Sequence, residues 1–324
     1  MMPLERTVVA RDKRFLLRVE TSHESADYRK YEELRNAIWD FPGDHLAATR
    51  NMMCENVFHE GASLFIGAFE ERPGGGFETD GGGLAGFCYG FVGVRDKEVA
   101  FRDPGNLRFY SQYAGVRPDR QGYGLGILLK EYQRDLVLGL LGVGAIICTY
   151  DPLVGVNAFR NVRHFGMDVL EYRTATYGEY GGRLNRTDVP TDRFLMFWDL
   201  RREGGRGAFD LESALAAPRP IRTGLRRVGG KTGEVELEIV EGTDPSVQGD
   251  LVLVPIPLDF YKMLRETDVA DPAVRRIPVD WRLAAREVFL ALFARGYEVI
   301  DFRKAEAPVH ANSYVLARAP GCRR

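Results

Sequence analysis

A glycine-spaced loop stands between an apolar, strand-like run and an amphipathic, helix-like pattern, and it constrains the fold more than any other segment. The loop and its flanks are Val116-Arg117-Pro118-Asp119-Arg120-Gln121-Gly122-Tyr123-Gly124-Leu125-Gly126. Glycines at alternate positions let the backbone approach a ligand closely, and a helix N-terminus offers unpaired N–H groups and a dipole that favours negative charge. The segment therefore predicts a strand, a phosphate-binding loop and a helix, in that order.

The spacing of these glycines does not match the motifs of other glycine-rich phosphate-binding loops. Gly122, Gly124 and Gly126 lie two residues apart, whereas the dinucleotide fingerprint is Gly-x-Gly-x-x-Gly followed by an acidic residue in the next unit. The glycine-spaced segment itself contains no Gly-Lys-Ser/Thr of a nucleoside triphosphate loop. A glycine-rich strand-to-helix turn without a ligand remains the structural alternative.

Hydrophobic periodicity predicts the elements around this loop. The predicted strands cover residues 15–20, 63–69, 83–94, 107–116, 145–150, 167–177 and 193–198. The predicted helices cover residues 25–41, 46–57, 125–140 and 156–165. In the third helix, the apolar stripe is Leu125, Leu128, Leu129, Tyr132, Leu136 and Leu140, and it would pack on a sheet.

The pattern Gln-x-x-Gly-x-Gly, with a proline three residues ahead of Gln121, resembles the acyl-CoA pyrophosphate loop of the GNAT (GCN5-related N-acetyltransferase) superfamily. The predicted order of elements over residues 13–200 resembles the same family. This resemblance implies an α/β (α+β) fold with a mixed, mostly antiparallel sheet flanked by helices. It also implies acetyl-CoA or another acyl-CoA as co-substrate, and direct transfer of the acyl group to an amine.

The resemblance also assigns roles to residues near the loop. Val116 would pair with the pantetheine arm, and the pyrophosphate would bind at Gln121, Gly122, Tyr123, Gly124, Leu125 and Gly126. Lys130 is expected at the solvated surface of the following helix.

The general acid of the family is usually a tyrosine four residues before a Gly-Phe turn, and that place is Val162 here. This departure puts the standard mechanism in doubt. The candidate substitutes are Tyr113, Tyr150 and His164, and no carboxylate in residues 109–116 offers a base. Asn157 in the same segment is a further candidate contact to the cofactor.

Tyrosines, arginines and glycines cluster in residues 172–193, where the resemblance implies the acceptor pocket. Tyr177, Tyr180 and Arg193 are the candidate acceptor-binding residues, and structural ion pairs are the alternative explanation of such arginines. Together with residues 149–153, these segments are similar to those of an uncharacterised branch of predicted acetyltransferases. The acceptor is expected to be the amine of a small molecule or peptide.

A length of 324 residues favours two domains. We predict a GNAT acyl-CoA-binding domain over residues 1–200, a linker or crossover over 201–222, and a C-terminal α/β unit over 223–324. Residues 166–172 and 296–302 match in character, because each begins with glycine after a predicted helix and before a strand. The sequence leaves open whether the C-terminal unit is a degenerate repeat of the second half of the fold or contains an ordinary helix–glycine–strand junction.

Composition narrows the function further. The formal net charge of -2 argues against nucleic-acid and membrane partners, and the N-terminus lacks a signal pattern, so a cytoplasmic location is expected. The scattered cysteines and histidines indicate reduced thiols and no metal site. A homodimer is compatible with the sequence. The alternative function is a CoA-binding regulatory or assembly protein with little or no catalysis, which the absent tyrosine favours.

Overall fold

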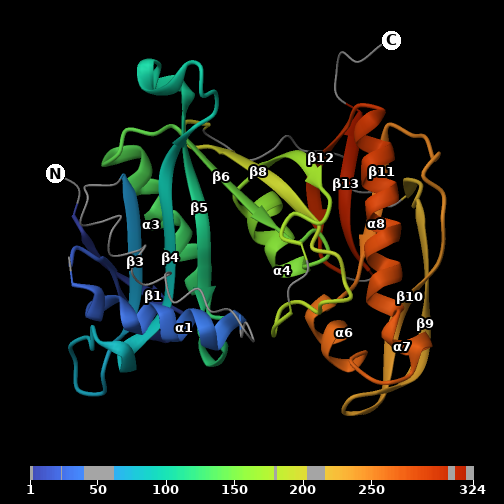
Figure 1. The fold of residues 1–324 in the computed structure, drawn as a ribbon, viewed down its shortest axis with the longest axis horizontal. Helices are drawn as coiled ribbons and strands as arrows, with labels where there is room; N and C mark the ends of the chain where they lie inside the picture. Colours follow the sequence, from blue (N-terminus) through green and yellow to red (C-terminus); the bar gives the residue numbers. More distant parts are fainter. Residues whose placement is uncertain are drawn as a thin grey trace. The chain divides into compact units, whose positions relative to one another are not determined.

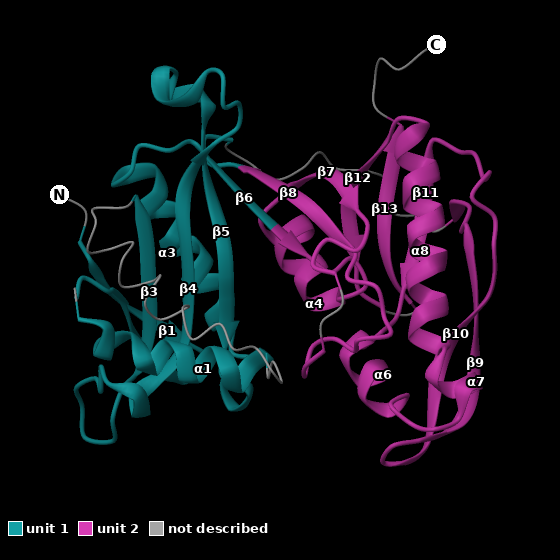
Figure 2. Ribbon diagram, in the orientation of Figure 1, with its two compact units in different colours: residues 1–148, 199–202 teal, residues 149–198, 203–324 magenta. Residues whose placement is uncertain are grey.

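The computed structural model describes residues 3–22, 24–39, 62–178, 181–202, 216–305 and 311–318. The chain divides into two compact units: residues 1–148 with 199–202, and residues 149–198 with 203–324 (Figure 2). The boundaries of these compact units differ from the predicted domain boundary near residue 200. That domain boundary stays a prediction. The predicted helix over residues 46–57 and residues 203–215 of the predicted linker lie outside the described residues.

A mixed sheet with the strand order β1-β2-β3-β4-β5-β6-β8-β7 dominates the fold (Figure 1). Neighbours from β1 to β5 are antiparallel, as are β7 and β8, whereas β5 and β6 run parallel. The predicted mixed, mostly antiparallel sheet is therefore confirmed. The strands are β1 (Glu5–Ala10), β2 (Lys13–Val19), β3 (Ser63–Glu70), β4 (Leu84–Val94), β5 (Leu107–Val116), β6 (Ala145–Tyr150), β7 (Asp168–Arg173) and β8 (Arg193–Asp199).

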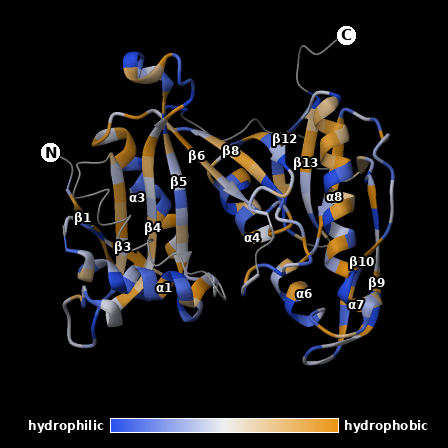
Figure 3. Ribbon diagram, in the orientation of Figure 1, coloured by the Kyte–Doolittle hydropathy of each residue, from blue (hydrophilic) through white to orange (hydrophobic). Residues whose placement is uncertain are grey.

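Helices α1 (Arg29–Trp39) and α3 (Leu125–Gly139) cover opposite faces of this sheet in the first unit. On β4, the ring of Phe87 packs against α1, with its centroid 6.2 Å from that of Trp39. A Cβ added to the preceding Gly86 would lie 3.2 Å from Leu129 of α3. Because successive residues of a strand face opposite sides, the two helices sandwich the sheet. The central strands β3 and β4 are accordingly rich in apolar residues (Figure 3).

Several predicted elements have different bounds in the structure. The first predicted strand is the second arm of a hairpin formed by β1 and β2. The strand predicted to run to residue 177 ends at Arg173, because Ala175 and Gly178 adopt positive φ angles in a turn. The predicted helix over residues 156–165 is α4 (Gly155–Ala158) followed by a π-helical turn over Phe159–His164.

The C-terminal part of the second unit contains a two-stranded ribbon, a three-stranded sheet and helices. The ribbon over residues 221–243 was not predicted, and its first residues fall in the predicted linker. The elements are β9 (Ile221–Gly230), β10 (Gly233–Thr243), β11 (Leu251–Ile256), α6 (Phe260–Glu266), α7 (Pro272–Arg275), α8 (Ile277–Ala294), β12 (Tyr297–Arg303) and β13 (Asn312–Arg318). None of the described helices is long and apolar enough to span a membrane.

The three-stranded sheet, ordered β11-β13-β12, repeats the order β6-β8-β7 at the end of the large sheet. Gly166 precedes β7 with φ +63°, and Gly296 precedes β12 with φ +78°. In each strand the register shifts between the third and fifth residues after that glycine, which is the same position for a β-bulge. The two segments that match in sequence therefore also match in strand order, pairing and bulge.

Candidate functional site

The glycine-spaced loop joins the end of β5 to the start of α3, as predicted. Residues 118–120 form a short 3-10 turn, and α3 begins at Leu125. Gly122 and Gly124 have φ angles of +80° and +88°, in the left-handed region that favours glycine. A Cβ built on Gly124 would meet no atom within 4 Å, so the space beside this backbone is open.

The backbone N–H groups of this loop are available to a ligand. Among the described residues, none of the N–H groups of residues 122–126 has a hydrogen-bond partner. Gln121 instead supports the loop, because its Nε2 donates to the carbonyl oxygen of Val116 over 3.1 Å. Unpaired N–H groups at the N-terminus of a 15-residue helix can bind a phosphate group.

The strand before the loop has a β-bulge at Gln112, because Tyr89 pairs with Tyr113 and Gly90 pairs with Ser111. The bulge places Ser111 and Tyr113 on opposite faces of the sheet. The Ser111 hydroxyl contacts Gln133 of α3, whereas the Tyr113 ring packs against Trp39 of α1. Pairing of β5 with β6 is confined to Phe109–Ile146 and Tyr110–Ile147, so it stops before this bulge. Bulges often re-aim side chains next to active sites.

Charged side chains beside the loop pair with one another. Glu70 binds Lys13 and Arg120, and Asp119 binds Arg117 at 2.7 Å and Arg120 at 2.9 Å. Partial burial disfavours the charged carboxyl of Glu70, but the hydrogen bonds from Arg120 and Lys13 outweigh it and lower its pKa. Each of these three cations thus has a carboxylate partner.

No protein-family model and no curated protein matches the chain. Solved structures do match. The ribosomal-protein-S5-alanine acetyltransferase of Vibrio fischeri shares 12% identity over 62% of this chain and 100% of its own, with a TM-score of 0.43. The ribosomal-protein-S18-alanine N-acetyltransferase of Escherichia coli shares 18% sequence identity over 60% of this chain and 99% of its own, with a TM-score of 0.39. Arabidopsis thaliana NAA60, solved with acetyl-CoA, shares 15% sequence identity over 58% of this chain and 99% of its own, with a TM-score of 0.41.

The strand order, and the loop between two parallel neighbouring strands, agree with the family that the sequence resembles. The fold is of the GNAT type. The loop of this GNAT-type fold places Val116, Gln121, Gly122, Tyr123, Gly124, Leu125 and Gly126 together in the first unit. Asn157 belongs to the second unit, where its Oδ1 accepts a hydrogen bond from Arg160.

The position of the usual GNAT tyrosine is filled by the buried Val162. Of the three candidate substitutes, Tyr150 is buried and its hydroxyl lies 3.0 Å from that of Tyr314. His164 is exposed at the end of the π-helical turn. Tyr113 is half-buried, and its hydroxyl has no hydrogen bond to a residue that the structure describes.

Lys130 corrects one expectation. It is 2% exposed rather than solvated, and its Nζ donates to Ser111 Oγ at 2.7 Å and to Gln133 Oε1 at 3.2 Å. A buried ammonium needs such hydrogen-bonding partners because desolvation of a charge is costly. The residue therefore fixes α3 to the strand that precedes the loop.

Two of the candidate acceptor residues lie together in the second unit. The Arg193 guanidinium is 5.2 Å from the centre of the Tyr177 ring, and the Tyr177 hydroxyl is 2.6 Å from Thr149 Oγ1 at the end of β6. Tyr177 is 47% exposed and could therefore contact an acceptor. Arg193 is buried, with its Nη1 3.6 Å from Asp151. Tyr180 lies outside the described residues.

The sequence did not predict a buried charge network in the second unit. Arg282 of α8 is fully buried and holds Asp151 through two hydrogen bonds, of 2.9 and 2.5 Å. Arg286, one turn later, binds both carboxyl oxygens of Asp192, which also accepts a bond from the Tyr172 hydroxyl. Burial disfavours the charged carboxyl of Asp192, but these hydrogen bonds outweigh it and lower its pKa.

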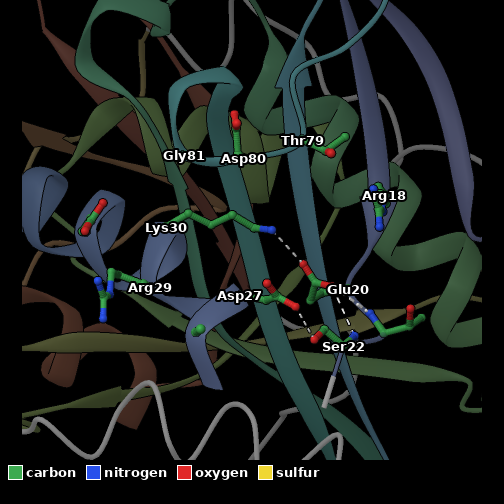
Figure 4. A pocket seen from close by; sticks show the side chains of 12 residues that line it. Arg18, Glu20, Ser22, Asp27, Arg29, Lys30, Thr79, Asp80 and Gly81 are labelled. Carbon is green, nitrogen blue, oxygen red and sulfur yellow. Dashed lines mark hydrogen bonds and ion pairs between the residues drawn. The ribbon is translucent and has the colours of Figure 1, made fainter. Parts of the chain in front are cut away.

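A polar pocket of about 540 Å³ opens between the end of β2, the start of α1 and the loop before β4 (Figure 4). Lys30 extends across it to Glu20, with 3.1 Å between Nζ and Oε2. Burial, followed by the negative charge of Glu20, raises the pKa of the adjacent Tyr31. None of the predicted site residues lines this pocket.

Proposed function

We propose that the protein is an acyl-CoA-dependent N-acyltransferase that uses acetyl-CoA as donor and the amine of a small molecule or peptide as acceptor. The observation that carries the proposal is the loop after β5, where two glycines in the left-handed region leave the N–H groups of residues 122–126 unpaired beside open space. The solved structures with similar folds include an acetyltransferase with acetyl-CoA bound. No metal takes part in this proposal, and cytoplasmic location and dimerisation stay predictions from the sequence.

In the proposed reaction, the loop binds the pyrophosphate and the backbone near Val116 pairs with the pantetheine arm. The neutral amine of the acceptor attacks the thioester carbonyl, so that a C–N bond forms and the C–S bond breaks. The amine nitrogen loses a proton, and the leaving thiolate of CoA gains one. A backbone N–H that polarises the carbonyl and an acid that protonates the thiolate would accelerate these steps.

Calorimetric titration of the full chain with acetyl-CoA and with free CoA tests this proposal. We expect micromolar binding of both ligands, because the loop would hold the pyrophosphate that they share. Release of free CoA thiol in the presence of a panel of small amines and peptides then tests turnover. If neither ligand binds, the loop has no CoA-binding function and the proposal is wrong.

We assign the role of general acid to Tyr113. Its hydroxyl has no hydrogen bond to any described residue, and the residue directly follows the bulge in β5. Replacing it with phenylalanine is expected to lower kcat by about 10²–10⁴-fold, which is the usual contribution of a general acid, without changing CoA affinity. The change of Tyr110, in the same strand, to phenylalanine is the matched control. An unchanged kcat for Tyr113→Phe would transfer the role to Tyr150 or His164, to be tested by Tyr150→Phe and His164→Gln.

On the acceptor side, we propose that Tyr177 and Arg193, with Tyr180, bind the amine substrate. The exposed Tyr177 would contact the acceptor directly, and the buried Arg193 would support its ring. Asn157 remains a proposed contact to the cofactor.

The second candidate function is a CoA-binding regulatory or assembly protein. The buried valine at position 162 favours it, because no hydroxyl can act from there. Micromolar CoA binding together with an absence of turnover across the amine panel would support this function over catalysis.

We further propose that the C-terminal unit is a degenerate repeat of the second half of the fold. The shared strand order, the two left-handed glycines and the equivalent bulges support a common origin. The second copy has helices α6 to α8 between its first two strands, where the first copy has α4. Through Arg282 and Arg286 it binds Asp151 and Asp192. In sequence, Asp151 and Asp192 lie on either side of Tyr177 and Tyr180, and Asp192 directly precedes Arg193.

A further inference from the structure

The hairpin loop between β1 and β2 carries an unusual residue. Ala10 pairs with Lys13, so Arg11 and Asp12 form a two-residue turn. Arg11 has a φ of +56°, a left-handed conformation that such turns normally assign to glycine or asparagine. A non-glycine residue pays about 1–2 kcal/mol for this conformation. Residues held in such unfavourable conformations often serve a functional site.

The Arg11 side chain lies against the glycine-spaced loop. Its guanidinium carbon is 5.0 Å from the centre of the Tyr123 ring, within the range of a cation–π interaction. A Cβ placed on Gly122 would be 3.8 Å from Arg11 Nη2. The loop's own aromatic side chain therefore holds a guanidinium next to the unpaired N–H groups of residues 122–126.

Arg11 differs from the other cations beside the loop. Lys13, Arg117 and Arg120 are paired with Glu70 or Asp119. Arg11 is exposed and forms no hydrogen bond or ion pair with any residue that the structure describes. A guanidinium presents a planar set of donors that matches a phosphate group. Arg11 can bind the phosphate of a ligand without first leaving a carboxylate partner.

We propose that Arg11 is a phosphate ligand for the nucleotide part of the acyl donor, and that it makes the site selective for a phosphorylated nucleotide carrier over a bare pantetheine thioester. This inference rests on the proposed function. CoA carries two kinds of phosphate, the diphosphate bridge and the 3′-phosphate monoester. Both are recognised by the same chemistry, so the choice of ligand identifies which one Arg11 contacts.

The test is calorimetric titration of the full chain and its variants with CoA and with dephospho-CoA, which lacks the 3′-phosphate. Arg11→Met removes the guanidinium but keeps a long side chain in the same turn. Because a hydrogen bond to a charged group contributes about 1.5–3 kcal/mol, we expect CoA affinity to fall at least about tenfold. Arg14→Met is the matched control, because Arg14 is in the same hairpin but is paired with Glu71, and we expect no more than about a twofold change.

The two ligands separate the two phosphates. A loss for CoA that disappears with dephospho-CoA identifies the 3′-phosphate, whereas an equal loss for both ligands identifies the diphosphate; either result supports the proposal. Arg11→Lys keeps the charge but not the planar donor set, and we expect an intermediate affinity. Equal affinities of the wild-type chain and Arg11→Met for both ligands would overturn the role of Arg11, while leaving the CoA site intact. Failure of the wild-type chain to bind CoA would instead overturn the proposed function.

Discussion

Replacing Arg282 with leucine is expected to lower the free energy of unfolding by about 3–5 kcal/mol, because it leaves a buried carboxylate without its partner. Arg282 is fully buried on α8, and Asp151, which it holds through two hydrogen bonds, is only 7% exposed. Asp151 is also 3.6 Å from Arg193, but one pairing at that distance cannot replace a bidentate one. Urea unfolding followed by tryptophan fluorescence measures the loss, because Trp198 and Trp281 both lie in the second unit.

The control for this prediction is Arg276→Leu. Arg276 forms an exposed pair with Asp280 at 2.9 Å, and its removal is expected to cost no more than about 0.5 kcal/mol. Adding Asp151→Leu to Arg282→Leu removes both buried charges, and we expect it to recover part of the lost stability. If Arg282→Leu destabilised the protein no more than Arg276→Leu, the buried pair would not hold the C-terminal unit to the segment after β6.

The parts of the fold that the sequence predicted are those with strong local patterns. The strands at residues 107–116 and 145–150 have the predicted bounds, since their apolar runs are closed by a polar or glycine-rich turn on at least one side. The ribbon of β9 and β10 was not predicted. β9 shows no clear alternation of apolar and polar residues. In β10, Val235, Leu237 and Ile239 alternate with glutamates, which is a strand signal that the prediction overlooked.

The candidate site divides in the same way. The loop could be predicted because its conformation depends on its own glycines, and both Gly122 and Gly124 do adopt positive φ angles. The burial of Lys130 could not, because it depends on Ser111 in a strand 19 residues earlier. The same holds for Asp151, whose partner Arg282 lies 131 residues later. The only signal in the sequence is that Lys130 and Asp151 are charged residues among apolar neighbours. This signal does not identify the residue that pairs with each of them.

Replacing Gly124 with valine is expected to lower CoA affinity by about 100-fold or more while the chain still folds. The φ of +88° costs a β-branched residue about 1–2 kcal/mol, which a folded domain tolerates. The added side chain would project into space that is open in the structure and that the proposed pyrophosphate occupies. Losing about two charge-assisted hydrogen bonds to the loop accounts for a change of that size.

Gly142 provides a matched control for the backbone strain. It lies beyond the end of α3 with a φ of +67°, and a Cβ on it would also meet nothing within 4 Å. Gly142→Val therefore has a similar conformational cost at the other end of the same helix. Calorimetric titration with CoA should show near wild-type affinity for Gly142→Val and a severe loss for Gly124→Val. Because the strain is common to both variants, the difference between them reports only the space beside the loop, and equal affinities would mean that no phosphate binds there.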